Sequence, residues 1–283
     1  MEILVYGAVS SAIYALLAVG FTLIFGVARV INLAHGAFYA LAAYTTYICI
    51  NWMGLNVYVA MVIAILITIV FGIAVERFLI RPMRHSHLAV LLITLTVSAL
   101  VEELLAGVFS RESRSIPPLI DGSIDIAGVV VTSERALTFV CAVALIGGLI
   151  LFIERTKLGA AILAISQDPE AAEYVGIPSN RIFSIVMGIS AGLAAVAAVL
   201  ASPFQSVEPA MGLSPMVKAF TIVIVGGLGS IPGSVVAAIA LAFLETVVSF
   251  EVSSSWAELV SVAAVLIVLV VRPSGILGKR ELF

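Results

Sequence analysis

The pattern Gly-x-Ser-x-Gly at residues 188–192 is the first feature of the sequence that could carry chemistry. In hydrolases, this pattern places a nucleophilic serine on a turn between a strand and a helix. Here Ser190 lies in an apolar run rich in alanine and glycine, where small residues let helices pack closely. A serine nucleophile also needs a base, and two of the three histidines, His85 and His87, fall in a polar loop. We therefore interpret residues 188–192 as a helix-packing surface.

Metal and nucleotide chemistry have little support in the sequence. His85 and His87 could bind a metal, but two histidines without further ligands make a poor site, so we expect a solvated loop. The glycine-rich stretch 226–233 lacks the Gly-Lys-Ser/Thr of a phosphate-binding loop. We therefore expect neither an enzyme nor a chain that binds ATP, a metal or another cofactor. Any energy must come from a partner protein or an ion gradient.

Four charged residues stand in or beside apolar runs: Glu102, Glu103, Lys218 and Glu245. A charge within a membrane span is a functional candidate by default. The three glutamates lie near the ends of their runs, where carboxylates more often face water, so we expect them to be solvated. Lys218 opens a short helix and is ambiguous in the same way.

The composition identifies the kind of element that must position these residues. Of the 283 residues, 62% are hydrophobic and only 11% are charged, whereas soluble domains contain roughly 25% charged residues. The mean hydropathy is +1.23. These values exclude a soluble enzyme, and the net charge of −3 offers no basic footprint for nucleic acid. The fold class is therefore an all-α polytopic membrane protein with about 8–10 transmembrane helices.

The apolar runs are long enough for bilayer-crossing helices, which need roughly 20 apolar residues. The expected spans are 3–27, 31–52, 57–79, 88–109, 136–153, 181–202 and 256–271. The stretch 213–250 is too long for one span and is broken by glycines, so we expect a short helix near 215–225 and a second near 233–250. This gives nine passes if the short helix crosses and eight if it is re-entrant.

Two segments place glycine and polar groups inside long apolar stretches. The first contains Asn32, His35 and Gly36, and the second contains Gly226, Gly227 and Gly229. Backbone that leaves the helix at membrane depth must be buried in protein or line a wet cavity. Paired interruptions of this kind indicate an inverted internal repeat with a transport path at its interface. Asn32 and His35 either support the broken backbone or line the path.

The lysines and arginines predict the orientation of the chain. Cytoplasmic loops carry an excess of these residues. Strict alternation puts ten on one side: Arg29, Arg77, Arg81, Arg84, Arg155, Lys157, Arg181, Arg272, Lys279 and Arg280. Arg111, Arg114 and Arg135 fall on the other side. We therefore expect a cytoplasmic C-terminus, an external N-terminus, an external loop at 110–135 with turns at Pro117-Pro118 and Asp121-Gly122, and a cytoplasmic loop at 154–180.

The loop 154–180 reads as two short helices. Leu158, Ile162 and Ile165 recur on one helical face, with Gly159 beside them. Gln167 and Asp168 join the two helices, and Asp168 is an expected N-cap before Pro169. Glu170 suits the positive end of the second helix, Ala171 follows it, and Gly176 suits the position after its end. Helices this short are marginal alone, so we expect a partner protein to push on this loop.

Several of these segments resemble one known family. Glu170-Ala171-Ala172 with Gly176 resembles the short "EAA…G" signature of ATP-binding-cassette (ABC) importer permeases. Residues 20–26, 32–36, 76–77, 81–84, 226–233 and 272–278 together resemble the branched-chain amino acid ABC-transporter permeases, closest to the first of the two permease subunits. The resemblance spans nearly the whole chain, which we treat as one permease domain, 1–283.

The resemblance carries expectations about partners and substrate. It implies a second permease subunit, two ATPase subunits that hydrolyse ATP, an external solute-binding protein, and import of branched-chain amino acids across the inner membrane of a bacterium or archaeon. The residues of the loop implied in ATPase coupling are Leu158, Gly159, Gln167, Asp168, Glu170, Ala171 and Gly176. Pairing of two identical copies stays open, as does import of urea or short amides. A gradient-driven transporter is less favoured, because no coupling acid is obvious at the midplane.

Overall fold

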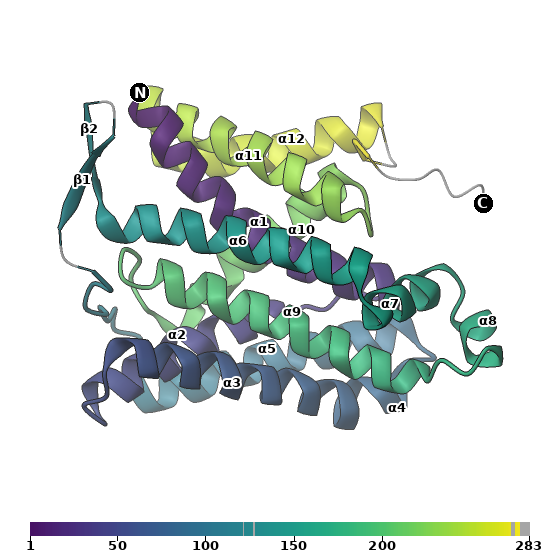
Figure 1. The fold of residues 1–283 in the computed structure, drawn as a ribbon. Coiled ribbons are helices and arrows are strands. Elements are labelled where there is room, and N and C mark those ends of the chain that lie inside the picture. The colour runs from purple at the N-terminus through teal and green to yellow at the C-terminus, as the bar shows by residue number, and fades with distance from the viewer. Residues whose placement is uncertain (121, 127, 273–274, 278–283) are drawn as a thin grey trace.

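The computed structural model describes residues 1–120, 122–126, 128–272 and 275–277 as a bundle of helices lying side by side (Figure 1). In chain order, the helices are α1 Glu2–Ala28, α2 His35–Asn51, α3 Val57–Val75, the π-helix η1 Glu76–Ile80, α4 Arg81–Met83, α5 His87–Phe109, α6 Ser133–Arg155, α7 Lys157–Gln167, α8 Pro169–Tyr174, α9 Ser179–Ala201, the 3-10 helix η2 Pro209–Gly212, α10 Leu213–Gly226, α11 Ile231–Glu251 and α12 Ser254–Val271. Within these ranges, eight helical segments are long and apolar enough to span a membrane. The predicted all-α membrane fold is confirmed.

A β-hairpin marks one end of the bundle, and α7 and α8 mark the other (Figure 1). We call these the hairpin end and the α7–α8 end. The hairpin pairs β1, Ser123–Ile126, antiparallel with β2, Val129–Thr132. We expected only a loop here; the strands form because a run of β-branched residues follows a turn in which Gly128 has φ +84°. The expected turn at Asp121 lies outside the described residues.

Helices α1 and α9 form the centre of the bundle, and both are buried over most of their length. Gly188 and Gly192 of α9 lie against Ile73 and Ile69 of α3, where an added Cβ would approach the isoleucine side chains to 3.1–3.2 Å. The interpretation of residues 188–192 as a packing surface is therefore confirmed. Ser190 between them is fully buried.

Two helices begin inside the bundle instead of at one of its ends. α2 starts at His35, beside the middle of α1, because residues 29–34 leave the helical pattern after Arg29 adopts φ +51°. The span predicted at 31–52 thus starts four residues too early. In the same way, residues 202–212 lead into α10 from the hairpin end. When residues 29–34 and 202–212 are counted with the helices that follow them, the described part of the chain runs between the two ends nine times.

Candidate functional site

The first broken segment is held by hydrogen bonds to its exposed backbone groups. The Asn32 side chain accepts from the Ala34 amide at 3.1 Å, and the Leu33 amide donates to the Thr94 hydroxyl at 3.2 Å. The His35 amide donates to the Asn32 carbonyl at 3.3 Å. The N-cap of α2 is Ala34, and no side chain of the described residues caps the helix. These bonds instead satisfy backbone groups just before α2 and support the break in the middle of the bundle.

His35, at the first position of α2, is 1% exposed. Its Nε2 lies 3.2 Å from the Leu17 carbonyl of α1, and its Nδ1 lies 3.4 Å from the Ser190 hydroxyl of α9. Phe21 and Phe38 pack against the ring edge-on. A neutral imidazole that donates from Nε2 and accepts at Nδ1 satisfies both contacts. His35 therefore ties the broken segment to the two central helices.

Gly36 makes a backbone contact that the sequence did not reveal. A Cβ on Gly36 would overlap the carbonyl oxygen of Gly212, and a Cβ on Gly212 would overlap that of Gly36. The start of α2 therefore touches the start of α10, and from this contact α2 runs to the hairpin end and α10 to the α7–α8 end. Tyr39 of α2 adds a hydrogen bond of 3.0 Å to Gln205. Two half-helices that meet in opposite directions are the arrangement that an inverted repeat would produce.

The second glycine segment lies at the α7–α8 end, away from His35. Gly226 and Gly233 are in backbone contact across the α10–α11 turn, where Gly227 and Gly229 have φ of +104° and +81°. A Cβ on Gly229 would lie 3.3 Å from the Cα of Gly26 in α1. The structure thus brings the predicted glycines to the end of α1, whereas Gly212, which we did not predict, reaches Gly36.

The loop after α6 folds as its cap residues predict. The Asp168 carboxylate accepts from the Glu170 and Ala171 amides at 3.0 Å each, and Gly176 has φ +86° just after α8. The face predicted for α7 is wrong at one position: Leu158 is 42% exposed. Gly159 is buried instead, because α7 turns back onto the end of α6, where a Cβ at Gly159 would overlap the Ile153 backbone.

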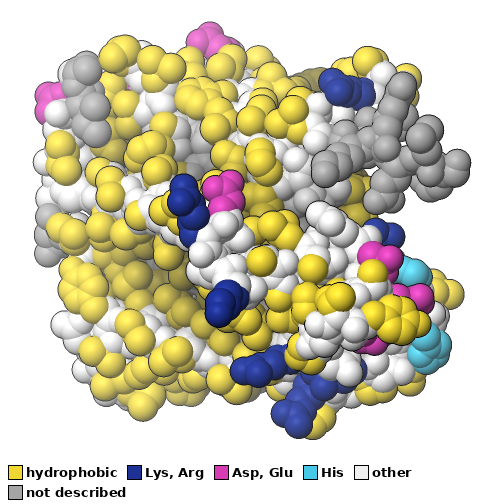
Figure 2. Space-filling view, turned by 45° about the vertical axis from the view of Figure 1, so that its right-hand side comes forward, with side chains coloured by type: hydrophobic (Ala, Val, Ile, Leu, Met, Phe, Trp, Pro, Cys, Tyr) yellow, Lys and Arg dark blue, Asp and Glu magenta, His cyan; other side chains and the backbone are white. Residues whose placement is uncertain are grey.

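The loop carries exposed apolar side chains that its sequence pattern did not predict. Tyr174 is 90% exposed and Val175 is 76% exposed, and Leu158 and Leu163 of α7 are each exposed by more than 40%. Figure 2 views this end obliquely and shows its Lys, Arg, Asp, Glu and His side chains around apolar ones. Apolar groups rimmed by polar residues mark protein contact sites. The sequence feature that could have predicted this exposed site is Tyr174-Val175, two apolar residues directly before Gly176, which follows the end of α8.

Arg29 links this loop to the first broken segment. Its guanidinium donates to the carbonyls of Ser166 and Gln167, the last residues of α7, at 3.5 and 3.4 Å. A groove of about 320 Å³ lies beside this contact and is lined by ten residues: Val27, Ala28, Arg29, Arg84, His87, Pro169, Glu170, Glu173, Ser179 and Phe183. Gln167, the last residue of α7, therefore contacts the first residue of the break.

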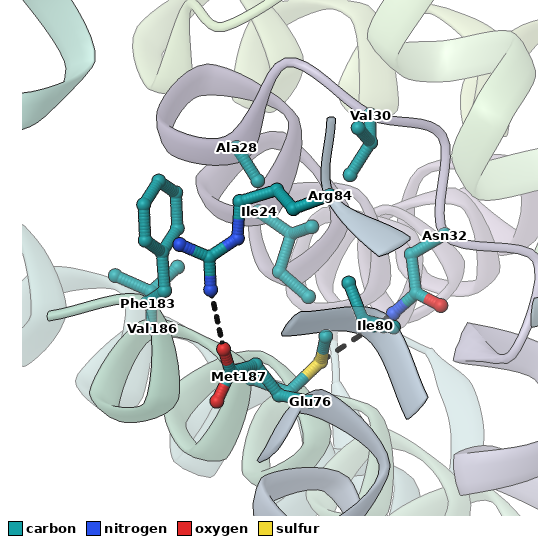
Figure 3. Close-up of a pocket in the computed structure, with 10 residues that line it drawn as sticks. All are labelled: Ile24, Ala28, Val30, Asn32, Glu76, Ile80, Arg84, Phe183, Val186 and Met187. Atoms are coloured by element: carbon teal, nitrogen blue, oxygen red, sulfur yellow. Dashed lines mark hydrogen bonds and ion pairs between the residues drawn. The ribbon is translucent and has the colours of Figure 1, made fainter. Parts of the chain in front are cut away.

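The buried carboxylate of Glu76 joins η1, α4 and α9 at the α7–α8 end of the bundle. Glu76, at the start of η1, accepts from Arg84 at 2.6 Å, Arg81 at 2.9 Å and the Ser184 hydroxyl of α9 at 2.5 Å. Figure 3 shows the Glu76–Arg84 ion pair and the Asn32–Met187 contact among the side chains that line a cavity of about 20 Å³. Glu76 thus holds α3 and α4 against the first turns of α9. We call these contacts the Glu76 clamp. Four residues separate the end of α8 from the start of α9.

Replacing Glu76 with glutamine is expected to loosen this clamp. The neutral glutamine no longer compensates the charges of Arg81 and Arg84. Removing one partner of a buried ion pair lowers the free energy of unfolding by about 3–5 kcal/mol. We expect about half of that here, because the two arginine side chains are 30% and 22% exposed. The midpoint of thermal unfolding in detergent should fall by several degrees. The matched control is Glu103→Gln in the exposed Glu103–Arg111 pair, which should change it by less than one degree. Equal shifts would contradict the clamp.

Glu245 corrects the expectation of solvated carboxylates, and Lys218, whose role the sequence left open, pairs with it. The Lys218 ammonium lies 2.8 Å from the Glu245 carboxylate, whose side chain is only 9% exposed. Tyr14 of α1 donates to the same carboxylate at 2.7 Å. The expectation failed because Glu245 faces α1 and α12 instead of the surface of the bundle. Glu103, by contrast, is exposed as predicted.

A bundle of apolar helices that contains two half-helices and a loop with exposed apolar side chains is the architecture of a multi-pass membrane protein. The model of the family described as "Branched-chain amino acid transport system / permease component" matches residues 3–270. The chain is 33% identical to the high-affinity branched-chain amino acid transport system permease protein BraD of Pseudomonas aeruginosa, over 99% of this chain and 96% of that protein. It is 31% identical to LivH of Escherichia coli K12, over 97% and 94%. The chain belongs to this permease family, as its resemblance indicated.

The fold is similar to that of a solved structure. "PsaBC from Streptococcus pneumoniae in complex with Fab" superposes with a TM-score of 0.55 at 15% identity and covers 97% of this chain and 93% of that one. At this identity, the likeness concerns the fold alone. It agrees with the arrangement of helices described above.

Proposed function

We propose that the chain is the permease subunit of an ABC importer that moves branched-chain amino acids across the inner membrane. Its partners would be a second permease subunit, two ATPase subunits and an external solute-binding protein. The observation that carries this proposal is the Arg29 contact, which connects the end of α7, directly before α8, to the broken segment. Family membership supports the solute, because the relatives are named for branched-chain amino acids.

In this proposal, the α7–α8 end is cytoplasmic and the hairpin end is external. The described arginines and lysines of the loops favour this orientation. Eight lie at the α7–α8 end, namely Arg29, Arg77, Arg81, Arg84, Arg155, Lys157, Arg181 and Arg272, against Arg111, Arg114 and Arg135 at the other. The tail lysine and arginine, Lys279 and Arg280, lie outside the described residues. The C-terminus is then cytoplasmic and the N-terminus external.

The solute path would open and close at the contact between Gly36 and Gly212. Asn32 and His35 hold the start of α2 in place, and the Gly226–Gly229 turn is where α10 can shift against α1. An ATPase that presses on Glu170, Ala171 or Gly176 would move α8. Because Leu158 is exposed and Gly159 is buried, Leu158 would touch the ATPase while Gly159 fixes α7 to α6.

The test is uptake of radiolabelled leucine, isoleucine and valine into proteoliposomes that contain the whole importer. Uptake is measured with and without ATP on the side of the membrane that carries the ATPases. We expect uptake only with ATP and the binding protein. Uptake of urea or short amides in place of these amino acids would favour the alternative solute. Uptake that follows an imposed ion gradient without ATP would overturn the importer.

Replacing Tyr174 with alanine is expected to weaken ATPase binding about tenfold or more, because exposed aromatic anchors dominate interface energy. Co-purification of the ATPase with the permease, titrated in detergent, measures this affinity. Trp256→Ala is the control, since Trp256 is an exposed aromatic residue at the hairpin end. An unchanged ATPase affinity for the Tyr174 variant would remove the α8 tip from the interface.

A further inference from the structure

Four helices contribute to one polar cluster inside the bundle. Lys218 of α10 donates to the Tyr14 hydroxyl at 2.5 Å and to the Glu245 carboxylate at 2.8 Å. Tyr14 donates to Glu245 at 2.7 Å, and Ser261 of α12 donates to the other oxygen of the same carboxylate. Glu245 therefore has three donors. An ammonium group has three N–H donors, and these contacts occupy two of those on Lys218.

The cluster lies at membrane depth. Tyr14 is twelve residues from the start of α1 and fourteen from its end, so it stands about 18 and about 21 Å from those ends at 1.5 Å per residue. The hydrocarbon core of a bilayer is about 30 Å thick. A charge at the middle of α1 is therefore far from either interface.

The Lys218 side chain is nevertheless 22% exposed. Its neighbours on the same side of α10 are Ser214, four residues earlier, and Val217, and both are exposed as well. Charged side chains within membrane spans almost always face the bundle interior or a water-filled cavity, because contact with lipid is costly. This face of α10 is therefore unsuited to lipid, although it lies on the outside of the single chain.

We infer that the face of α10 formed by Ser214, Val217 and Lys218 is a wall of the water-filled solute path, and that Lys218 presents there a fixed positive charge to the carboxylate of the solute. The inference rests on the proposed function and deepens it. The remaining N–H donor of Lys218 suits a carboxylate acceptor. The adjacent Glu245 offsets the lysine charge, so the contact is weak enough for the solute to leave, as conduction requires.

The first test is the access of water-soluble thiol reagents to this face in the assembled importer. In a chain whose Cys49 and Cys141 are replaced with serine, single cysteines are placed by Ser214→Cys and Val217→Cys. The control is Val262→Cys on α12, which follows Ser261 and so lies at the same depth, and which is 51% exposed. We expect the α10 cysteines to react at least about tenfold faster than the control. Equal rates, or no reaction at position 214 with and without ATP, would overturn the inference in favour of lipid or a packed subunit.

The second test reads the charge of Lys218 directly. In the Ser214→Cys chain, the ratio of the reaction rates with an anionic and a cationic methanethiosulfonate reagent reports the local potential. Lys218→Met should lower this ratio about tenfold, as one unit charge a few ångströms away in water predicts. Lys218→Arg should keep it and Glu245→Gln should raise it. A ratio unchanged by all three would show that Lys218 has only a structural role.

Uptake then connects the charge to the solute. Lys218→Met should lower leucine uptake about tenfold while Lys218→Arg retains at least half of it. Unchanged uptake by the methionine variant would contradict recognition of the carboxylate. The two reagent tests do not use a solute, so they stand even if the unmodified importer fails to carry leucine, which would count against the proposed function alone.

Discussion

Replacing Gly36 with alanine is expected to lower leucine uptake at least tenfold. Alanine normally favours a helix over glycine, but here its Cβ overlaps the Gly212 carbonyl oxygen. The obstacle is backbone, so no side chain can rotate away, and α2 and α10 must separate. Overpacking of this kind costs about 1–3 kcal/mol. The measurements are ATP-driven uptake in proteoliposomes and the midpoint of thermal unfolding in detergent, which should fall by several degrees.

The control for this prediction is another helical glycine. Gly148 of α6 has no atom within 4 Å of an added Cβ, so Gly148→Ala should keep both uptake and the midpoint. Gly212→Ala should repeat the Gly36 defect. The defect of the double variant should be smaller than the sum of the two single defects, because both substitutions disrupt the same backbone contact. Normal uptake by the Gly36 variant would show that the meeting of the half-helices has no part in transport.

Replacing Gly176 with proline is expected to uncouple ATP hydrolysis from transport. Gly176 has φ +86°, whereas proline requires φ near −65°. Proline also removes the amide that donates to the Glu173 carbonyl at 3.0 Å. The α8 tip is then misplaced while the spans are untouched. Leucine uptake should fall at least tenfold while ATPase activity stays within about twofold and the amount of protein in the membrane is unchanged.

Two further variants make this result specific to the loop. Glu170→Lys should uncouple in the same direction, because it places a positive charge at the positive end of α8 without changing the backbone. Gly54→Pro is the matched control: Gly54 also has a positive φ, +65°, with nothing within 4 Å of an added Cβ, but it lies in the α2–α3 turn at the hairpin end. Coupled uptake by both loop variants would remove residues 157–176 from the mechanism.

The sequence by itself determined the features that short stretches of chain encode. Long apolar runs predicted the spans, and Asp168, Pro169 and Gly176 predicted the start and end of α8 within a residue. The glycines at 226–233 predicted the α10–α11 turn. Each of these depends on residues within one helical turn or one span, so spacing and residue type were sufficient.

The tertiary structure alone decided which of these segments touch. The contact of Gly36 with Gly212, the pairing of Lys218 with Glu245 and Tyr14, and the Ser184 bond to Glu76 join residues that are 27 to more than 200 positions apart. The spans are apolar on every side, because their outer faces meet lipid instead of water. Such helices carry no polar face to show which side is buried, so the sequence could not distinguish a solvated Glu245 from a buried one.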